Sequence, residues 1–381
     1  MKLLIIGSLA ASSLSFPTLS QDPSWSTKTP NFWSLEQRDA GFRRMDAVYQ
    51  TRLVPSGNAV HHFGRGTPIN FGIDVAGYMK VQRASGLIIV HKNKIRLEKY
   101  ALSNSRSGQW ESFSVAKSIT STLLGVAVQD GFVHSLSDPV TNYIPGLKHS
   151  AYDNVSIRQL LTMTSGIRWN EDYQNPESDA VKLRLHRPPP GVDATVSYIS
   201  QLPRESAPGA KWVYKTGETN LVGVLVRHVT GKSLSDYLAE KIWKPYGMEQ
   251  AAKWELDDSG SEMGGCCLSA RLRDYARFGQ FILDGAKIGK KSILPADWLL
   301  HATSKQIDTG RPGRGYGYQW WTNDDGSFQA IGIFGQSIFI DPQRQLVIAT
   351  NANWPTASDA ALANGRSTFN KAVQSAIDAE K

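Results

Sequence analysis

The chain has 381 residues, of which 41% are hydrophobic and 20% charged, a globular composition that excludes a mostly disordered, collagen-like or coiled-coil protein. Lysine and arginine outnumber aspartate and glutamate by 42 to 34, giving a formal net charge of +8. The basic residues are scattered, whereas a nucleic-acid-binding protein usually concentrates them on one face. We therefore expect no nucleic-acid partner, and the sequence leaves the oligomeric state open.

An export signal is predicted at the amino terminus. Residues 1–20 begin with Lys2, continue through an apolar stretch from Leu3 to Leu14 and end in small residues near Ser20. That stretch is shorter than the ~20 residues that a membrane-spanning helix needs, and no cysteine follows it to carry a lipid. We expect a cleaved, exported protein, periplasmic or secreted, without a stable membrane anchor.

Local patterns predict helices and strands along the rest of the chain. Apolar runs or alternation between turn residues predict strands, and a 3.6-residue apolar period with capping residues predicts helices. In chain order, we expect a helix at 37–49, a β-hairpin at 86–97, helices at 114–130, 156–162, 219–229, 233–243 and 269–283, strands at 328–333, 336–340 and 346–350, and a terminal helix at 358–379. These elements predict an α/β (α+β) fold, with an antiparallel sheet built from both chain ends and flanked by helices.

The same order predicts how the chain is divided. After the signal, residues 21–80 are rich in aromatic residues, glycine and proline, which indicates an N-terminal arm. Residues 81–155 and 260–381 are expected to form the sheet domain. Residues 156–259 are expected to be a helical insertion that carries a tyrosine motif.

The two cysteines of the chain, Cys266 and Cys267, are adjacent. A disulfide of ordinary geometry is not expected between neighbours without strain, and no nearby histidine completes a zinc site. We expect both to be small buried side chains. No Gly-x-Ser-x-Gly motif occurs, which argues against an α/β-hydrolase arrangement. His-Glu-x-x-His and Gly-x-Gly-x-x-Gly motifs are also missing, so neither a metal nor another cofactor is expected.

A candidate nucleophile lies at the start of the 114–130 helix. Ser114 and Lys117 are three residues apart, which places them on one helical face. A serine hydroxyl needs a neighbouring base, and a lysine can serve when burial lowers its pKa. The alternative is a capping serine followed by a surface lysine, but the small, apolar residues after Lys117 argue against exposure.

A candidate proton relay precedes the 219–229 helix. Tyr214 is predicted to lie on a loop facing the cleft, and a core tyrosine is the alternative. Residues Lys215, Thr216 and Gly217 match the K-T-G triplet of penicillin-recognising enzymes. That triplet belongs on a strand near the carboxyl end, whereas here a helix is expected at once, so we interpret the match as coincidental.

Several motifs together resemble the serine β-lactamase-like hydrolases, which include class C β-lactamases, D-alanyl-D-alanine peptidases, family VIII carboxylesterases and 6-aminohexanoate-oligomer hydrolases. The resemblance spans about residues 40 to 355 and is strongest to the 6-aminohexanoate-dimer hydrolases. It rests on Ser114–Ser118, on Leu160–Ile167 with Met163 in place of a histidine, on Thr230–Ser233 and Lys244–Met248, and on Asn170–Tyr173, Gln319–Trp321 and Ile331–Gln336.

This resemblance implies a β-lactamase/transpeptidase-like fold and a set of catalytic roles. Ser114 would be the acylated nucleophile, Lys117 its proton partner and Tyr214 the general acid/base. The backbone amides of Ser114 and Ile333 would form the oxyanion hole.

Further positions concern the substrate. Tyr173 and Trp321 resemble substrate-contacting aromatic residues, with core packing as the alternative. The chain departs from the family at Thr216, where asparagine is common, at Ala330, where β-lactamases have a lysine, and at Phe334, where a histidine can occur. Without that lysine, a β-lactam or peptide carboxylate lacks its usual cation.

We therefore expect an exported serine hydrolase that acts through an acyl-enzyme on small-molecule carboxylic esters or small amides. One alternative is a β-lactamase or D-alanyl-D-alanine peptidase, which export and family resemblance favour. A second is a non-catalytic binding protein on the same fold, which the departures at Thr216 and Ala330 favour.

Overall fold

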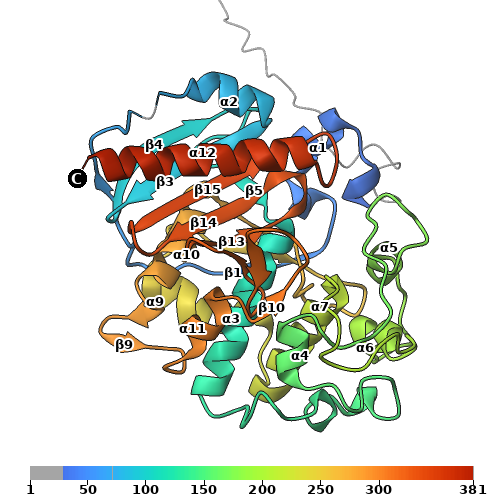
Figure 1. Ribbon diagram of the computed structural model, residues 1–381. Coiled ribbons are helices and arrows are strands. Elements are labelled where there is room, and N and C mark those ends of the chain that lie inside the picture. The colour runs from blue at the N-terminus through green and yellow to red at the C-terminus, as the bar shows by residue number, and fades with distance from the viewer. Residues whose placement is uncertain (1–28, 71, 381) are drawn as a thin grey trace, which may run out of the picture.

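The computed structural model describes residues 29–70 and 72–380, so the predicted export signal lies outside the described residues. Within them, nine strands form the main sheet, in the order β10-β11-β12-β13-β14-β15-β3-β4-β2 (Figure 1). The strands are β2 (Gly64–Arg65), β3 (Ala84–His91), β4 (Lys94–Tyr100), β10 (Ile307–Asp308), β11 (Arg314–Tyr316), β12 (Trp321–Asn323), β13 (Phe328–Ile331), β14 (Ser337–Asp341) and β15 (Leu346–Ala352). Both ends of the chain thus contribute to one sheet, as predicted.

The hairpin and the joint between the chain ends follow from the sequence. Lys92 and Asn93 adopt positive φ angles of 49° and 59°, which close the predicted turn between β3 and β4. β15 pairs antiparallel with β3, with Thr350 opposite Leu87. One pair departs from the predicted antiparallel pattern, because β2 runs along the edge of β4 in the same direction. The sheet is therefore mixed.

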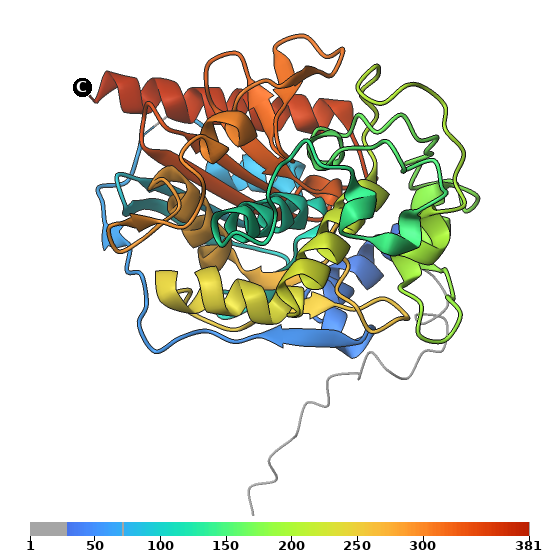
Figure 2. The same ribbon diagram turned by 90° about the horizontal axis from the view of Figure 1, so that it is seen from below.

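Helices cover both faces of this sheet (Figures 1 and 2). On one face, α12 (Ala360–Ala379) buries Phe369, Val373 and Ile377 against β3 and β15, as the predicted terminal helix should. On the other face, α3 (Ala116–Gln129) and α10 (Leu272–Leu283) join the larger core cluster. The molecule therefore has three layers, with helices on both sides of the sheet. In this arrangement the start of α3 lies next to the connection between β13 and β14.

A second sheet was not predicted. Within the described residues it has four strands in the order β1-β6-β7-β5. They are β1 (Thr51–Val54), β5 (Gln109–Glu111), β6 (Ala252–Glu255) and β7 (Leu268–Arg271). The helix expected from residue 269 begins only at Leu272, because Ser269 and Ala270 pair with β5 instead. Long-range strand pairing overrides the local helical pattern there.

Most of the remaining helices form the helical half of the molecule around α3, whereas α2 packs against β3 on the α12 side of the main sheet. The other predicted helices are present with adjusted ends, but the helix expected at 37–49 ends at Gly41 and is followed only by a short 3-10 turn at Met45–Ala47. α3 packs against α7. No helix in residues 29–70 and 72–380 is long and apolar enough to cross a membrane. The elements are α1 (Leu35–Gly41), α2 (Val75–Val81), α4 (Ile157–Leu161), α5 (Asp179–Arg184), α6 (Ala194–Ile199), α7 (Thr216–Thr230), α8 (Leu234–Leu238), α9 (Lys244–Tyr246), β8 (Lys287–Ile288), β9 (Lys291–Ser292) and α11 (Trp298–Thr303).

Candidate active site

Ser114 lies in a tight turn that connects β5 to α3. The turn spans Phe113–Val115, and Phe113 has a φ of 44°, a conformation that bulky residues rarely adopt. The fully buried carboxylate of Glu111 accepts a hydrogen bond from the Phe113 amide at 3.1 Å and from the Ser269 hydroxyl at 3.0 Å. Glu111 therefore stabilises the strained backbone that presents Ser114.

Lys117 lies one helical turn beyond Ser114 and is only 1% exposed. Its Nζ donates to Ser114 Oγ at 3.1 Å, to Thr216 Oγ1 at 2.9 Å and to the Gly265 carbonyl at 2.6 Å. All three acceptors are neutral, and burial lowers the pKa of Lys117 to about 8. The structure thus brings together Ser114 and Lys117, as their spacing in the sequence predicts. Burial makes it easier for the lysine to lose its proton.

Glu171 connects the lysine to the cleft wall and was not singled out from the sequence. Its carboxylate accepts hydrogen bonds from the Thr216 hydroxyl and, at 2.9 Å, from the Thr216 amide. The Trp169 indole and the Tyr173 hydroxyl also donate to it. Its negative charge opposes part of the fall in the Lys117 pKa. Thr216 therefore accepts from Lys117 while donating to Glu171, which keeps a hydrogen-bonding group where the family commonly has asparagine.

Tyr214 faces Ser114 from the loop before α7. Its ring stacks on Trp321 with centroids 5.7 Å apart, and Lys117 Nζ lies 5.2 Å from the ring centroid. Burial, together with the Glu171 charge, raises the pKa of Tyr214, while hydrogen bonding with Ser114 opposes that rise. The phenol is therefore neutral and can donate a proton near the nucleophile.

The K-T-G match has the context expected of a coincidence. α7 begins at Thr216, so the triplet opens a helix and does not lie on a strand. Lys215 is buried and pairs with Glu218 at 3.5 Å. It is not among the residues that line the cleft.

The cleft has a volume of about 750 Å³ and is lined by five of the six predicted site residues. These are Ser114, Tyr173, Tyr214, Trp321 and Ile333. The sixth, Lys117, lies beneath Ser114. The two aromatic residues, Tyr173 and Trp321, also make contacts within the protein. The Tyr173 hydroxyl donates a hydrogen bond to Glu171, and Trp321, only 8% exposed, packs against the Tyr316 ring. Their contact with a substrate stays a prediction.

The two other family departures lie outside the cleft. Phe334 is buried, packs its ring 5.4 Å from that of Phe113 and lies beneath the Arg38 guanidinium. Ala330 is fully buried in β13. Neither residue lines the cleft, so any cation that faces a substrate there comes from other elements.

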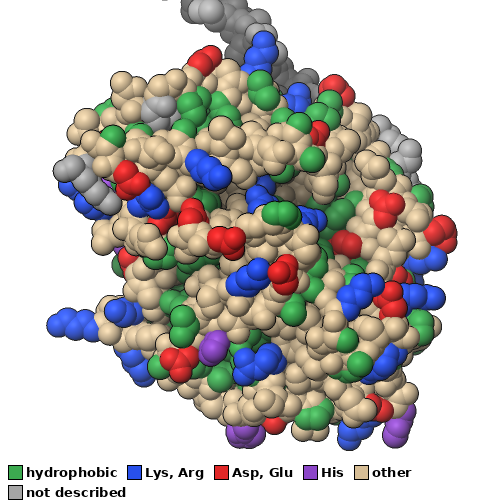
Figure 3. All heavy atoms as spheres, viewed as in Figure 1, with side chains coloured by type: hydrophobic (Ala, Val, Ile, Leu, Met, Phe, Trp, Pro, Cys, Tyr) green, Lys and Arg blue, Asp and Glu red, His purple; other side chains and the backbone are tan. Residues whose placement is uncertain are grey.

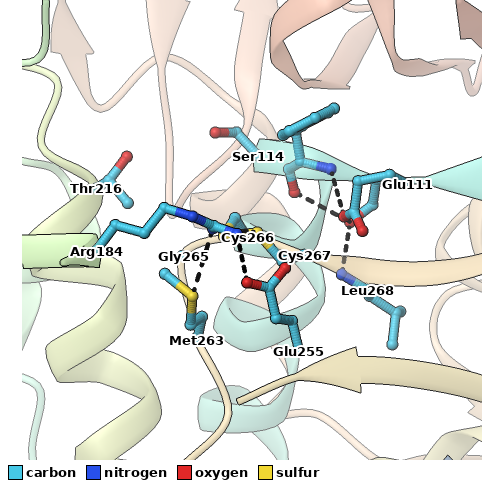
Figure 4. The surroundings of a disulfide bond; sticks show 12 residues. Glu111, Ser114, Arg184, Thr216, Glu255, Met263, Gly265, Cys266, Cys267 and Leu268 are labelled. Carbon is cyan, nitrogen blue, oxygen red and sulfur yellow. Dashed lines mark hydrogen bonds and ion pairs between the residues drawn. A yellow bond between two sulfur atoms is a disulfide. The ribbon is translucent and has the colours of Figure 1, made fainter. Parts of the chain in front are cut away.

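The expectation for the cysteines was wrong, because Cys266 and Cys267 form a disulfide (Figure 4). The chain can make this bond between neighbours because it turns tightly after Gly265, with Cys267 at a φ of 79°. Arg184 approaches the Cys267 sulfur at 3.5 Å and pairs with the buried Glu255. The disulfide directly follows the Gly265 carbonyl that accepts a hydrogen bond from Lys117, so it borders the buried lysine.

The chain is similar in sequence to known proteins. The beta-lactamase family model matches residues 74–369. The 6-aminohexanoate-dimer hydrolase of Paenarthrobacter ureafaciens is 27% identical over 285 residues, which cover 70% of this chain and 72% of that protein.

Solved structures show the same fold. A Bacillus anthracis protein, provisionally assigned as a 6-aminohexanoate-dimer hydrolase, superposes with a TM-score of 0.79 at 22% identity, covering 93% of this chain and 99% of that one. A family VIII carboxylesterase superposes with a TM-score of 0.59 at 16% identity, covering 77% and 94%. The chain therefore belongs to the beta-lactamase family of serine hydrolases.

Proposed function

We propose that this protein is an exported hydrolase that forms an acyl-enzyme on Ser114 and cleaves carboxylic esters or small amides. The observation that carries the proposal is the 3.1 Å contact between Ser114 Oγ and Lys117 Nζ in a buried site. With the pKa of Lys117 lowered to about 8, about a tenth of the lysine is neutral at neutral pH. This fraction can accept the serine proton.

The proposed reaction has two halves. As Ser114 Oγ attacks the carbonyl carbon, its proton passes to neutral Lys117, and negative charge develops on the carbonyl oxygen. The amides of Ser114 and Ile333 are proposed to bind that oxygen. Tyr214 donates its proton to the departing alcohol or amine as the carbonyl re-forms and the bond between the carbonyl carbon and the leaving group breaks. The Tyr214 phenolate recovers a proton from Lys117, and water then cleaves the serine ester by the reverse transfers.

The relatives support the choice of substrate class. Those named above are a 6-aminohexanoate-dimer hydrolase and a carboxylesterase, which cleave amides and esters respectively. Beta-lactamases of Pseudomonas fluorescens and Yersinia enterocolitica are also similar, at 24% and 22% identity. By the family resemblance, the buried Ala330 occupies the strand position where β-lactamases carry a lysine, and the lack of that cation disfavours β-lactams.

A substrate screen tests this proposal. Nitrophenyl esters of short acids, a nitroanilide and a chromogenic cephalosporin are offered to the wild type and to Ser114→Ala. We expect turnover of esters or anilides by the wild type only. Faster turnover of the cephalosporin would favour the β-lactamase alternative, and turnover by Ser114→Ala would exclude the mechanism.

Export is tested separately. We expect the full chain, expressed in a Gram-negative host, to accumulate outside the cytoplasm with a new amino terminus near residue 21. An intact Met1 in a cytoplasmic fraction would contradict export and leave the hydrolase proposal unaffected.

A further inference from the structure

Three arginine side chains line the same cleft as Ser114. Arg311 lies in the loop before β11, Arg314 begins β11, and Arg366 lies on α12. In the space-filling view, a hollow opens below the N-terminal part of α12, with Lys and Arg side chains at its edge (Figure 3). Two segments that are distant in the chain thus place positively charged side chains in the same cleft.

These guanidinium groups have neutral partners. In the described part of the chain, no carboxylate lies within the 4.0 Å of an ion pair from any of the three. Arg314 donates to the Ser367 hydroxyl at 3.1 Å, and Arg366 to the Gly335 carbonyl at 3.3 Å. Among the described residues, the three positive charges therefore have no ion-pair partner.

The charge of Arg314 repels those of Arg311 and Arg366. Burial, with a smaller contribution from Arg314, lowers the pKa of Arg366 to about 10. Burial and the neighbouring Arg311 lower the pKa of Arg314 in the same way. Arg366 is only 4% exposed, so water screens its charge poorly. A bound anion would relieve this repulsion.

The acidic residues of the cleft are engaged elsewhere. Glu171 accepts from the Thr216 amide at 2.9 Å, besides the groups already described. Asp172 accepts from the Gln174 amide at 2.9 Å, and Asp359 caps α12 by accepting from Leu362 at 2.9 Å. None of them neutralises the arginines.

We propose that Arg311, Arg314 and Arg366 form a carboxylate-binding subsite, so that the favoured substrate is an ester or amide that carries a free carboxylate. Guanidinium groups bind carboxylates through paired, charge-assisted hydrogen bonds. These cations come from β11, its preceding loop and α12, and not from the strand position occupied by Ala330. The inference rests on the proposed function and names its substrate class.

Trp321 indicates what separates the carboxylate from the scissile bond. The Arg311 guanidinium lies 5.2 Å from the centroid of the Trp321 rings, and the Tyr214 ring stacks on Trp321 with centroids 5.7 Å apart. An apolar wall therefore connects the arginines with the catalytic phenol. A substrate with a methylene spacer between its carboxylate and its scissile carbonyl fits this arrangement.

Two matched esters test the subsite, namely the mono-p-nitrophenyl ester of adipic acid and the same ester with its free carboxylate methylated. For the wild type we expect kcat/KM to be at least about tenfold higher for the charged ester, with the preference falling as salt is added. In Arg311→Gln/Arg314→Gln the charged-to-neutral ratio should approach one. Lys290→Gln/Lys291→Gln removes the same charge from the exposed β8–β9 hairpin and should keep the wild-type ratio.

The outcomes separate this inference from the proposed function. Equal wild-type rates on both esters, or a preference that survives Arg311→Gln/Arg314→Gln, would overturn the subsite and leave the hydrolase proposal standing. If neither ester is cleaved, the proposed ester hydrolysis fails. In that case, binding of adipate to Ser114→Ala is measured by calorimetry. Saturable binding that is lost when Arg311 and Arg314 are also replaced supports the subsite. No binding overturns it. If the arginine variant does not fold, the wild-type ester ratio and its salt dependence decide.

Discussion

The rings of Phe113 and Phe334 lie 5.4 Å apart and pack two left-handed turns against each other. Each turn carries one of the amides predicted to bind the oxyanion, because Phe113 precedes Ser114 and Phe334 follows Ile333. Their φ angles are 44° and 59°, so tertiary packing stabilises two conformations that the isolated chain disfavours. The family departure at Phe334 is thus part of the framework of the site.

Replacing the Phe334 ring should show whether its packing positions the Ile333 amide for catalysis or affects substrate binding. Phe334→Ala is expected to lower the free energy of unfolding by about 3–5 kcal/mol, and to lower kcat more than it raises KM. Phe334→Leu retains most of the volume and should lose less of both. Chemical denaturation and steady-state kinetics measure the two effects. An alanine variant with wild-type kcat would show that this packing does not position Ile333.

The pH dependence of turnover should reflect Lys117. Since the lysine accepts the serine proton only when it is neutral, kcat/KM should rise with pH and level off above a pKa of about 8. Lys117→Arg keeps a cation that cannot lose its proton, so it should reduce activity by at least about a hundredfold. A pH–rate profile flat through this range, measured with an ester whose own hydrolysis is subtracted, would contradict the role of Lys117.

Glu171→Gln should move that profile. Removing the negative charge takes away an interaction that favours protonated Lys117, so the pKa of the lysine should fall and the rise in kcat/KM should begin at lower pH. Asp172→Asn removes an equal charge one residue further on, from a carboxylate that accepts from Gln174, and should shift the profile less. A shift of the Glu171→Gln profile to higher pH would refute this coupling.

The disulfide should affect turnover more than stability. A bond between neighbouring residues closes almost no loop, so its loss should change the free energy of unfolding little. It restrains the turn that contains the Gly265 carbonyl, which binds Lys117 at 2.6 Å. Cys266→Ser/Cys267→Ser, or the wild type treated with a reducing dithiol, should therefore have a lower kcat.

Mass spectrometry provides the control for that experiment. The untreated protein should be lighter by two hydrogens than the reduced protein, and it should resist alkylation until it is reduced. Equal kcat for the oxidised wild type and the serine variant would show that the disulfide does not position the lysine. A full complement of free thiols in the untreated protein would contradict the disulfide itself.

Features encoded in short stretches of sequence were predictable. The β3–β4 hairpin, α12 and the pairing of Ser114 with Lys117 each depend on residues close together in the chain, and the structure contains all three. Tyr214 was predicted from the loop before the 219–229 helix and Ile333 from the family resemblance, and both lie far from Ser114 in sequence but line the same cleft.

Features that depend on distant segments were not predictable in this way. The second sheet assembles four short strands from separate parts of the chain, and none has a strong pattern of its own. Glu171 lay within a recognised motif, but only the fold shows that it connects Tyr173 and Thr216. The arginine cluster likewise requires α12 to lie beside β11. Domain boundaries and catalytic roles stay predictions.

The most direct test of the account is the intact mass of the mature protein after exposure to a serine-directed phosphonate ester, with Ser114→Ala treated in parallel. We expect one phosphonyl adduct on the wild type, located on the peptide that contains Ser114, and none on the variant. An unmodified wild type, or an adduct on both proteins, would contradict an activated nucleophile at Ser114.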